Sequence, residues 1–262
     1  MKRGGFWVWF WFGLGWLYFI LPLLGTFIFS LRAKRDTFSF LAYENVFNDP
    51  VFWERFGFSA LMAVLAIIVS LLLVVPTAYW VQLRLPRLRP VIELMTLLPF
   101  VIPAVVLVFG LIRVYSRPPF ALTGSATTTN ILLVAGYTVL SLPYMYRAVD
   151  TGLRAIDVRT LTEAAQSLGA GWPTILFQVI FPNLRAALLS GAFLTFAIVI
   201  GEYVLATYLA RPAFAPYMVL VGQSRVYEAS ALAIISFALT WACIGLIQFL
   251  GRGEESQLAG TH

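Results

Sequence analysis

Charged residues are scarce in this chain of 262 residues: they make up 11% of it, whereas hydrophobic residues make up 60%. A soluble globular domain carries about 25% charged and about 45–50% apolar residues. Both departures point toward the lipid bilayer. The net charge is +6, but the basic residues lie mostly between apolar runs, where they set topology and contact anionic headgroups. We therefore expect no nucleic-acid partner.

Residues that carry catalysis or hold metals are also rare. Cys243 is the single cysteine and His262 is the single histidine. An intrachain disulfide is therefore impossible, and we expect neither a catalytic residue nor a metal site. The phosphate-binding pattern G-x-x-x-x-G-K-[ST] does not occur in the sequence. We therefore expect no cofactor in this chain.

Long apolar runs dominate what is present. A run of about 18 or more apolar residues is typical of a transmembrane helix, so the sequence predicts an all-α membrane protein in which residues 1–262 form one transmembrane domain. The first run exceeds the about 7–15 residues of a signal-peptide core, and we expect it to be retained. The six predicted spans cover about 6–31, 58–81, 91–112, 129–149, 185–206 and 229–250.

Basic residues in the loops predict the orientation. The loop QLRLPRLRP places Arg84, Arg87 and Arg89 in a short turn between the second and third spans. Because short loops rich in arginine stay in the cytoplasm, this loop is expected inside. With six spans, both termini then lie inside.

A polar stretch at residues 150–184 separates the fourth and fifth spans. Its helical spacing predicts a short helix that stops at Gly169, where glycine supplies a flexible backbone. Pro173 suits the first turn of a second helix, and Pro182 marks a break before the fifth span. We expect a helix–turn–helix elbow on the inner face; the alternative is a solvated loop. The residues expected to line one side of the first helix are Ile156, Leu161, Ala164, Ala165 and Leu168, whereas Asp157, Arg159 and Glu163 are expected to project from it.

The centre of this stretch reads EAAQSLGAGWPTILFQVIFP from 163 to 182. Its spacing resembles the EAA loop of permease subunits of binding-protein-dependent ABC importers, which follows the pattern E-A-A, x3, G, x9, I-x-L-P. Val179 and Phe181 are conservative departures from that pattern. The flanking segments YRAVDTGLRAID and PNLRAALLSGAFLTF look like the polyamine, ferric-iron and phosphonate branch of these permeases.

The resemblance implies a type I ABC importer permease fold with a cytoplasmic coupling helix between helices 4 and 5. That helix would dock into a groove on an ATPase. The coupling residues carried over by the resemblance are Glu163, Ala164, Ala165 and Gly169, flanked by Asp157 and Pro182. The implied partners are a second homologous permease, two ATPases that bind ATP and Mg, and an extracytoplasmic substrate-binding protein. The implied location is the bacterial inner membrane, and the chain would not be an enzyme.

Ionisable residues within spans predict functional sites. Glu202, late in the fifth span, is expected either to meet a cationic substrate or to pair with an arginine of the partner permease. Glu93 is expected at the membrane interface. Further candidates for the substrate pathway are Tyr144 and Tyr203, which could instead only pack, and Pro99 and Pro103, which could gate the pathway or only kink a packed helix.

The expected substrate is a polyamine or a similar small charged organic solute. Ferric iron and phosphonate are alternatives. A stand-alone secondary transporter would need coupling-ion residues and usually an internal repeat. The sequence has one Glu within a span and no visible repeat, so the secondary transporter is a less favoured alternative. A membrane-embedded enzyme would need a cluster of His, Asp or Cys at one membrane face, and the sequence has none.

Overall fold

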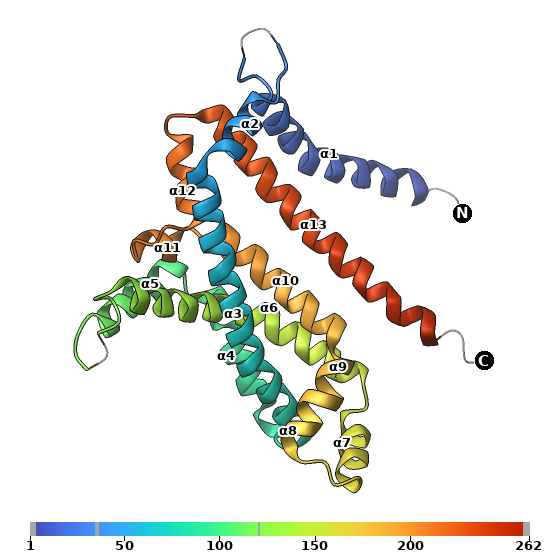
Figure 1. The fold of residues 1–262 in the computed structure, drawn as a ribbon. Coiled ribbons are helices and arrows are strands. Elements are labelled where there is room, and N and C mark those ends of the chain that lie inside the picture. Colours follow the sequence, from blue (N-terminus) through green and yellow to red (C-terminus); the bar gives the residue numbers. More distant parts are fainter. Residues whose placement is uncertain (1–3, 35–36, 120, 259–262) are drawn as a thin grey trace.

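The computed structural model describes residues 4–34, 37–119 and 121–258, and every named element in these ranges is a helix (Figure 1). The expected all-α fold is confirmed; His262 lies outside the described residues. The elements are α1 Gly4–Ser30, α2 Leu41–Asn48, α3 Pro50–Leu83, η1 Pro86–Leu88, α4 Arg89–Val101, α5 Ala104–Tyr115, α6 Ala126–Ala155, α7 Val158–Ser167, α8 Trp172–Thr174, η2 Ile175–Ile180, α9 Phe181–Asn183, α10 Arg185–Gly201, α11 Val204–Tyr208, α12 Phe214–Gly222 and α13 Val226–Leu258.

Three of these helices, α1, α3 and α6, are long and apolar enough to cross a membrane. Two pairs of bent helices could each supply one further span, which gives up to five by length and composition. The apolar part of α13, Val226–Ala242, is shorter. The expected count of six spans and the inside position of both termini stay predictions.

The third predicted span is not one straight helix. α4 and α5 meet at an angle of 100°, so the helix expected over 91–112 is wrong as a single element. Pro103 begins the second half and has no N–H for the helix ladder, and Ile102 before it is extended, as a residue preceding proline prefers. Pro99 lies inside α4 without interrupting it.

The fifth predicted span is shorter than 185–206, because α10 ends at Gly201 and a separate helix, α11, begins at Val204. The break expected at Pro182 is also displaced. Pro182 lies in the first turn of α9, where its missing N–H costs nothing. The chain turns by 79° at the junction between α9 and α10, at Leu184.

The centre of the molecule is formed by α3, α6 and α10, which pack along one another (Figure 1). The hydroxyls of Ser70 and Ser141 lie 3.1 Å apart in a buried contact between α3 and α6. Close approach of α6 and α10 requires glycine, because a Cβ at Gly152 would lie 2.5 Å from the Cβ of Ala187. Small residues and interhelical hydroxyls are typical of helix contacts in membranes.

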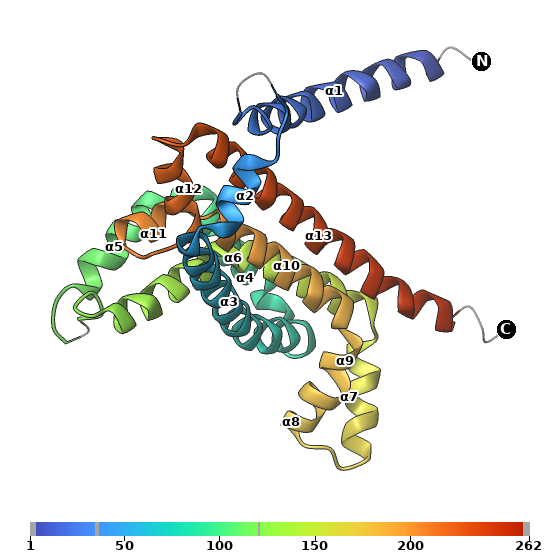
Figure 2. The same cartoon turned by 45° about the horizontal axis from the view of Figure 1, so that its top comes forward.

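α1 extends away from this centre and approaches α13 and α2 near its C-terminal end, as Figures 1 and 2 both show. The rings of Phe29 and Tyr227 lie 4.9 Å apart there. The short helices α7 to α9 project from the opposite end of the molecule (Figure 2). This projection contains the polar stretch that the sequence singled out.

Candidate functional site

The projecting elbow, residues 156–184, begins where α6 ends. Ile156 is extended, and Asp157 then caps α7. The carboxylate of Asp157 accepts hydrogen bonds from the hydroxyl of Thr160 at 2.7 Å and from its backbone N–H at 3.1 Å. The hydroxyl bond, followed by the backbone bond, holds the pKa of Asp157 below its ordinary value. A charged cap of this kind starts a helix at a defined residue.

One side of α7 packs against the rest of the elbow. Val158, Thr162 and Ala165 are buried, and the spacing of three and four residues puts them on one face. Val158 and Ala165 share an apolar cluster with Ile175 and Ile180 of η2, a π-helical segment.

The expected packed face is therefore only partly right. Ala165 lies on it, but Ala164 is exposed and Leu168 is 87% exposed. Leu168 lies off this face because α7 ends at Ser167 and the turn that follows carries it away. Ala164 lies within α7, beside the buried face rather than on it.

The turn of the elbow depends on glycine. Gly169 has a φ of +79°, in the left-handed region, and its N–H donates to the carbonyl of Gln166 at 2.9 Å. Gly171 is extended, and Pro173 lies in the first turn of α8. The expected helix–turn–helix is confirmed as local structure.

Aromatic residues attach the elbow to α3. The ring of Trp172 lies 4.8 Å from that of Tyr79 and 4.9 Å from that of Trp80. The hydroxyl of Tyr79 also lies 2.9 Å from that of Thr162. The sequence did not predict this attachment, although the aromatic pair at the end of an apolar run was a visible signal.

The outward side of the elbow we call the tip surface: Glu163, Ala164, Leu168 and Gly169, all exposed. Glu163 pairs with Arg159 one turn earlier at 2.8 Å, and both side chains are mostly in solvent. Pro182 and the Asp157 cap lie at the base of the elbow, outside this surface.

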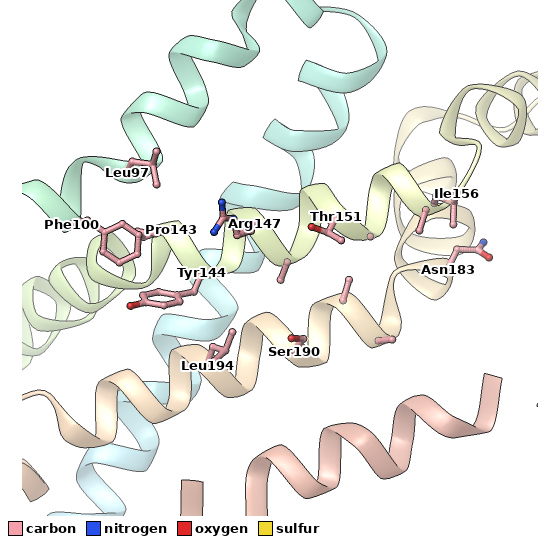
Figure 3. Close-up of a pocket in the computed structure, with 15 residues that line it drawn as sticks. Leu97, Phe100, Pro143, Tyr144, Arg147, Thr151, Ile156, Asn183, Ser190 and Leu194 are labelled. Carbon is pink, nitrogen blue, oxygen red and sulfur yellow. The ribbon is translucent and has the colours of Figure 1, made fainter. Parts of the chain in front are cut away.

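A groove of about 600 Å³ runs along α6 between α4 and α10. Figure 3 shows Tyr144 and Arg147 on α6, with Leu97 and Phe100 of α4 on one side and Ser190 of α10 on the other. The complete lining is Leu97, Phe100, Pro143, Tyr144, Arg147, Ala148, Thr151, Gly152, Ala155, Ile156, Asn183, Ala186, Ala187, Ser190 and Leu194.

A network of four charges lies beside the groove. Arg89 contacts Asp150 at 3.0 Å and Glu93 at 2.8 Å, and Arg154 contacts the same two acids at 2.7 and 3.6 Å. Glu93, expected at the interface, thus takes part in an ion-pair network between α4 and α6. The sequence did not predict this network, because α4 and α6 are distant in the chain.

The predicted pathway residues do not gather in one place. Tyr144 lines the groove, with its ring 5.4 Å from that of Phe100. Pro99, Pro103 and Tyr203 are not part of the lining.

Glu202 also lies outside the groove lining, and it is 9% exposed. Its carboxylate accepts hydrogen bonds from the backbone N–H groups of Val204 at 2.8 Å, Leu205 at 3.0 Å and Ala206 at 3.3 Å. It therefore caps α11, a role that the sequence did not indicate.

A bundle of apolar helices with a lateral groove and a polar elbow at one end has the architecture of a membrane permease. Residues 75–252 match the family described as "binding-protein-dependent transport system inner membrane component", and the chain belongs to this family. It is a multi-pass membrane protein and a permease subunit of an ABC importer. Subunits of this family are not enzymes, because a partner protein is the ATPase.

Relatives carry names for different solutes. The chain is 29% identical over 240 residues to a probable molybdenum ABC transporter permease of Haloferax volcanii. The matched region covers 90% of this chain and 86% of the relative. It is 25% identical to the spermidine/putrescine permease PotB of Haemophilus influenzae, over 74% of each chain. A solved bacterial ABC transporter for import of the polysaccharide alginate shares the fold, with a TM-score of 0.69 at 19% identity, over 95% of this chain and 98% of that one.

Proposed function

We propose that this chain forms half of the translocation pathway of an ATP-driven importer in the bacterial inner membrane. A second homologous permease would complete the pathway, and two ATPases, which bind ATP and Mg, would dock at the elbow. An extracytoplasmic binding protein would deliver the substrate. With both termini inside, the elbow faces the cytoplasm, where the ATPases are.

The tip surface carries this proposal. Leu168 is 87% exposed on a turn held in shape by the positive φ of Gly169. An apolar side chain on a defined, solvent-facing turn suits insertion into a groove of another protein. Burying a leucine side chain contributes about 1.5–3 kcal/mol, and exposed Ala164 beside it allows close approach. Glu163 adds a charge that a partner arginine could contact.

The packing behind the tip surface supports transmission of motion. Ile175, Leu176 and Ile180 of the elbow belong to the same buried cluster as Val75 of α3 and Met145 of α6. Because packed interiors have few voids, displacement of the elbow moves these helices with it. α6 also lines the groove, so an ATPase that pulls on the elbow acts on the pathway.

The coupling itself is thermodynamic. Nucleotide can drive transport only if it binds one conformation of the complex better than the other. In our proposal, closure of the ATPases draws the two elbows together and turns the pathway outward, and hydrolysis returns it.

The substrate expected from the sequence is a polyamine or a similar small charged organic solute, with ferric iron or phosphonate as alternatives. The flanking segments resemble the branch that includes polyamine, ferric-iron and phosphonate permeases, so they agree with all three. The relative named for spermidine and putrescine supports the polyamine. The relative named for molybdenum supports a different solute. All of these candidate substrates are small and charged.

The test is purification of the tagged chain in mild detergent, with co-eluting proteins identified by mass spectrometry. We expect an ATPase to co-elute with the wild type, and Leu168→Ser to weaken its binding by about tenfold or more. Glu163→Lys and Gly169→Pro should also release it. Leu88→Ser is the matched control, because Leu88 is an exposed leucine outside the elbow. Equal recovery of the ATPase with every elbow variant would contradict the docking proposal.

A further inference from the structure

We propose that the groove binds an oxyanion through Arg147, so that the transported substrate carries negative charge on oxygen atoms. This inference rests on the proposed function, in which the groove belongs to the pathway, and it names the substrate class. The lining of the groove contains one charged residue, Arg147. Arg147 also lines an adjoining hollow of about 510 Å³, together with Glu93, Asp150 and Arg154. Figure 3 shows its guanidinium on the side of α6 that faces α4, away from Ser190 of α10.

The neighbouring arginines are paired with acids, whereas Arg147 is not. Arg89 and Arg154 both pair with Glu93 and Asp150 at the edge of the groove. Arg147 has no acidic oxygen within 4.0 Å among the described residues. Arg147 is exposed, so its guanidinium can bind a ligand without first breaking an ion pair. Charged residues of membrane helices that face a water-filled cavity mark substrate pathways.

A polyamine would need the opposite arrangement. Its ammonium groups require carboxylates that are free to pair, and the two acids nearest the groove are each held by arginines at 3.0 Å or less. Glu202 was the acid on which the sequence-based expectation of a cationic substrate rested. Its carboxylate accepts hydrogen bonds from the N–H groups of α11, and it is not part of the groove lining.

Arginine offers the groove a planar fork of N–H donors that matches phosphate, sulfate or carboxylate oxygens in pairs. Thr151 lines both the groove and the adjoining hollow, and its hydroxyl could donate a further hydrogen bond. A volume of about 600 Å³ lies within the about 300–1,000 Å³ of small-molecule sites. The same chemistry would also hold the phosphate of a lipid headgroup, so the experiment must separate the two sources.

The experiment uses the complete transporter in nanodiscs, with Cys243→Ala as background. Leu97→Cys is the reporter, because Leu97 is exposed and lines both the groove and the adjoining hollow. Modification of the reporter by a neutral maleimide is followed by peptide mass spectrometry. The probes are molybdate, sulfate, inorganic phosphate and spermidine, with chloride at matched ionic strength. We expect at least one oxyanion to slow modification and spermidine to have no effect. Arg147→Gln should raise the half-protecting concentration by about tenfold.

Two variants serve as controls. Arg147→Lys keeps the charge without the fork and should fall between wild type and Arg147→Gln. Arg185→Gln removes an exposed arginine that does not line the groove, and protection should remain as in the wild type. Protection that survives Arg147→Gln would overturn the inference, and so would protection by spermidine or by none of the probes.

The lipid arm compares nanodiscs of phosphatidylcholine with nanodiscs that also contain phosphatidylglycerol. Protection by phosphatidylglycerol alone would assign the groove to a headgroup and overturn the substrate inference. Retention of the ATPase is measured on the same samples. Loss of the ATPase from the wild type would count against the docking proposal, whereas the protection data decide the substrate class separately.

Discussion

The hydroxyl groups of Tyr79 and Thr162 lie 2.9 Å apart in a buried contact that joins α3 to α7. The hydroxyl of Thr162 also donates to the carbonyl of Val158 at 2.7 Å, so Tyr79 is the donor in the shared bond. This bond connects the elbow to a helix that runs the length of the molecule (Figure 1). Movement of the elbow is therefore transmitted to α3.

Tyr79→Phe removes this bond but keeps the ring against Trp172. A buried hydrogen bond contributes about 1 kcal/mol net, so we expect α7 to open more often. The measurement is hydrogen–deuterium exchange of the amides in 158–167, which should speed up several-fold. Tyr208→Phe, at an exposed tyrosine, is the control. Equal exchange in all three proteins would show that the bond does not hold the elbow.

Gly169→Ala forces a side chain into the left-handed region at a φ of +79°, at a cost of about 1–2 kcal/mol. We expect a lower melting temperature and weaker retention of the ATPase. Gly171→Ala is the matched control, because Gly171 is extended and an added Cβ would meet no atom closer than 3.9 Å. If both variants melt at the same temperature, the conformation of Gly169 does not contribute to stability.

Glu202→Ala removes the cap of α11 and should destabilise the protein by about 1–2 kcal/mol. Glu202→Gln keeps an acceptor oxygen and should cost less. Thermal unfolding and uptake are to be measured together. We expect uptake to fall in proportion to the loss of stability. Impaired uptake with an unchanged melting temperature would instead favour the predicted contact with a cationic substrate.

Asp49, which precedes α3, predicts a dependence on pH. Partial burial opposes its ionisation, but hydrogen bonds from the N–H of Val51, the hydroxyl of Tyr217 and the guanidinium of Arg225 outweigh burial and lower its pKa. Because the folded pKa lies below the unfolded value of about 4, the stabilisation is present above pH about 4 and is lost as the pH falls through the folded pKa.

The expected result is a melting temperature that declines below pH about 4 by less in Asp49→Asn than in the wild type. Glu54→Gln is the control, since Glu54 is mostly exposed and its contact to Arg55 is 3.8 Å long. Parallel pH profiles for the wild type and Asp49→Asn would show that ionisation of Asp49 does not contribute to stability.

The elbow shows how far sequence reasoning reached. Gly169 and Pro173 have restricted or unusual backbones, and these local properties predicted the turn and the start of the second helix. Leu168 was misplaced, because its direction depends on where α7 ends. The attachment through Tyr79 and Trp172 brings together residues far apart in the chain, and no local pattern predicts such pairs.

The sequence by itself determined the helical membrane class, the positions of the long apolar runs and the elbow between two of them, since these follow from composition, helical spacing and the backbone preferences of glycine and proline. Only the tertiary structure decided the 100° bend before Pro103, the capping role of Glu202 and the neutralised acids beside an unpaired Arg147. The reason is physical: helix propensity acts within a few residues, whereas a carboxylate's role depends on which donors the packed helices bring within about 3 Å of it.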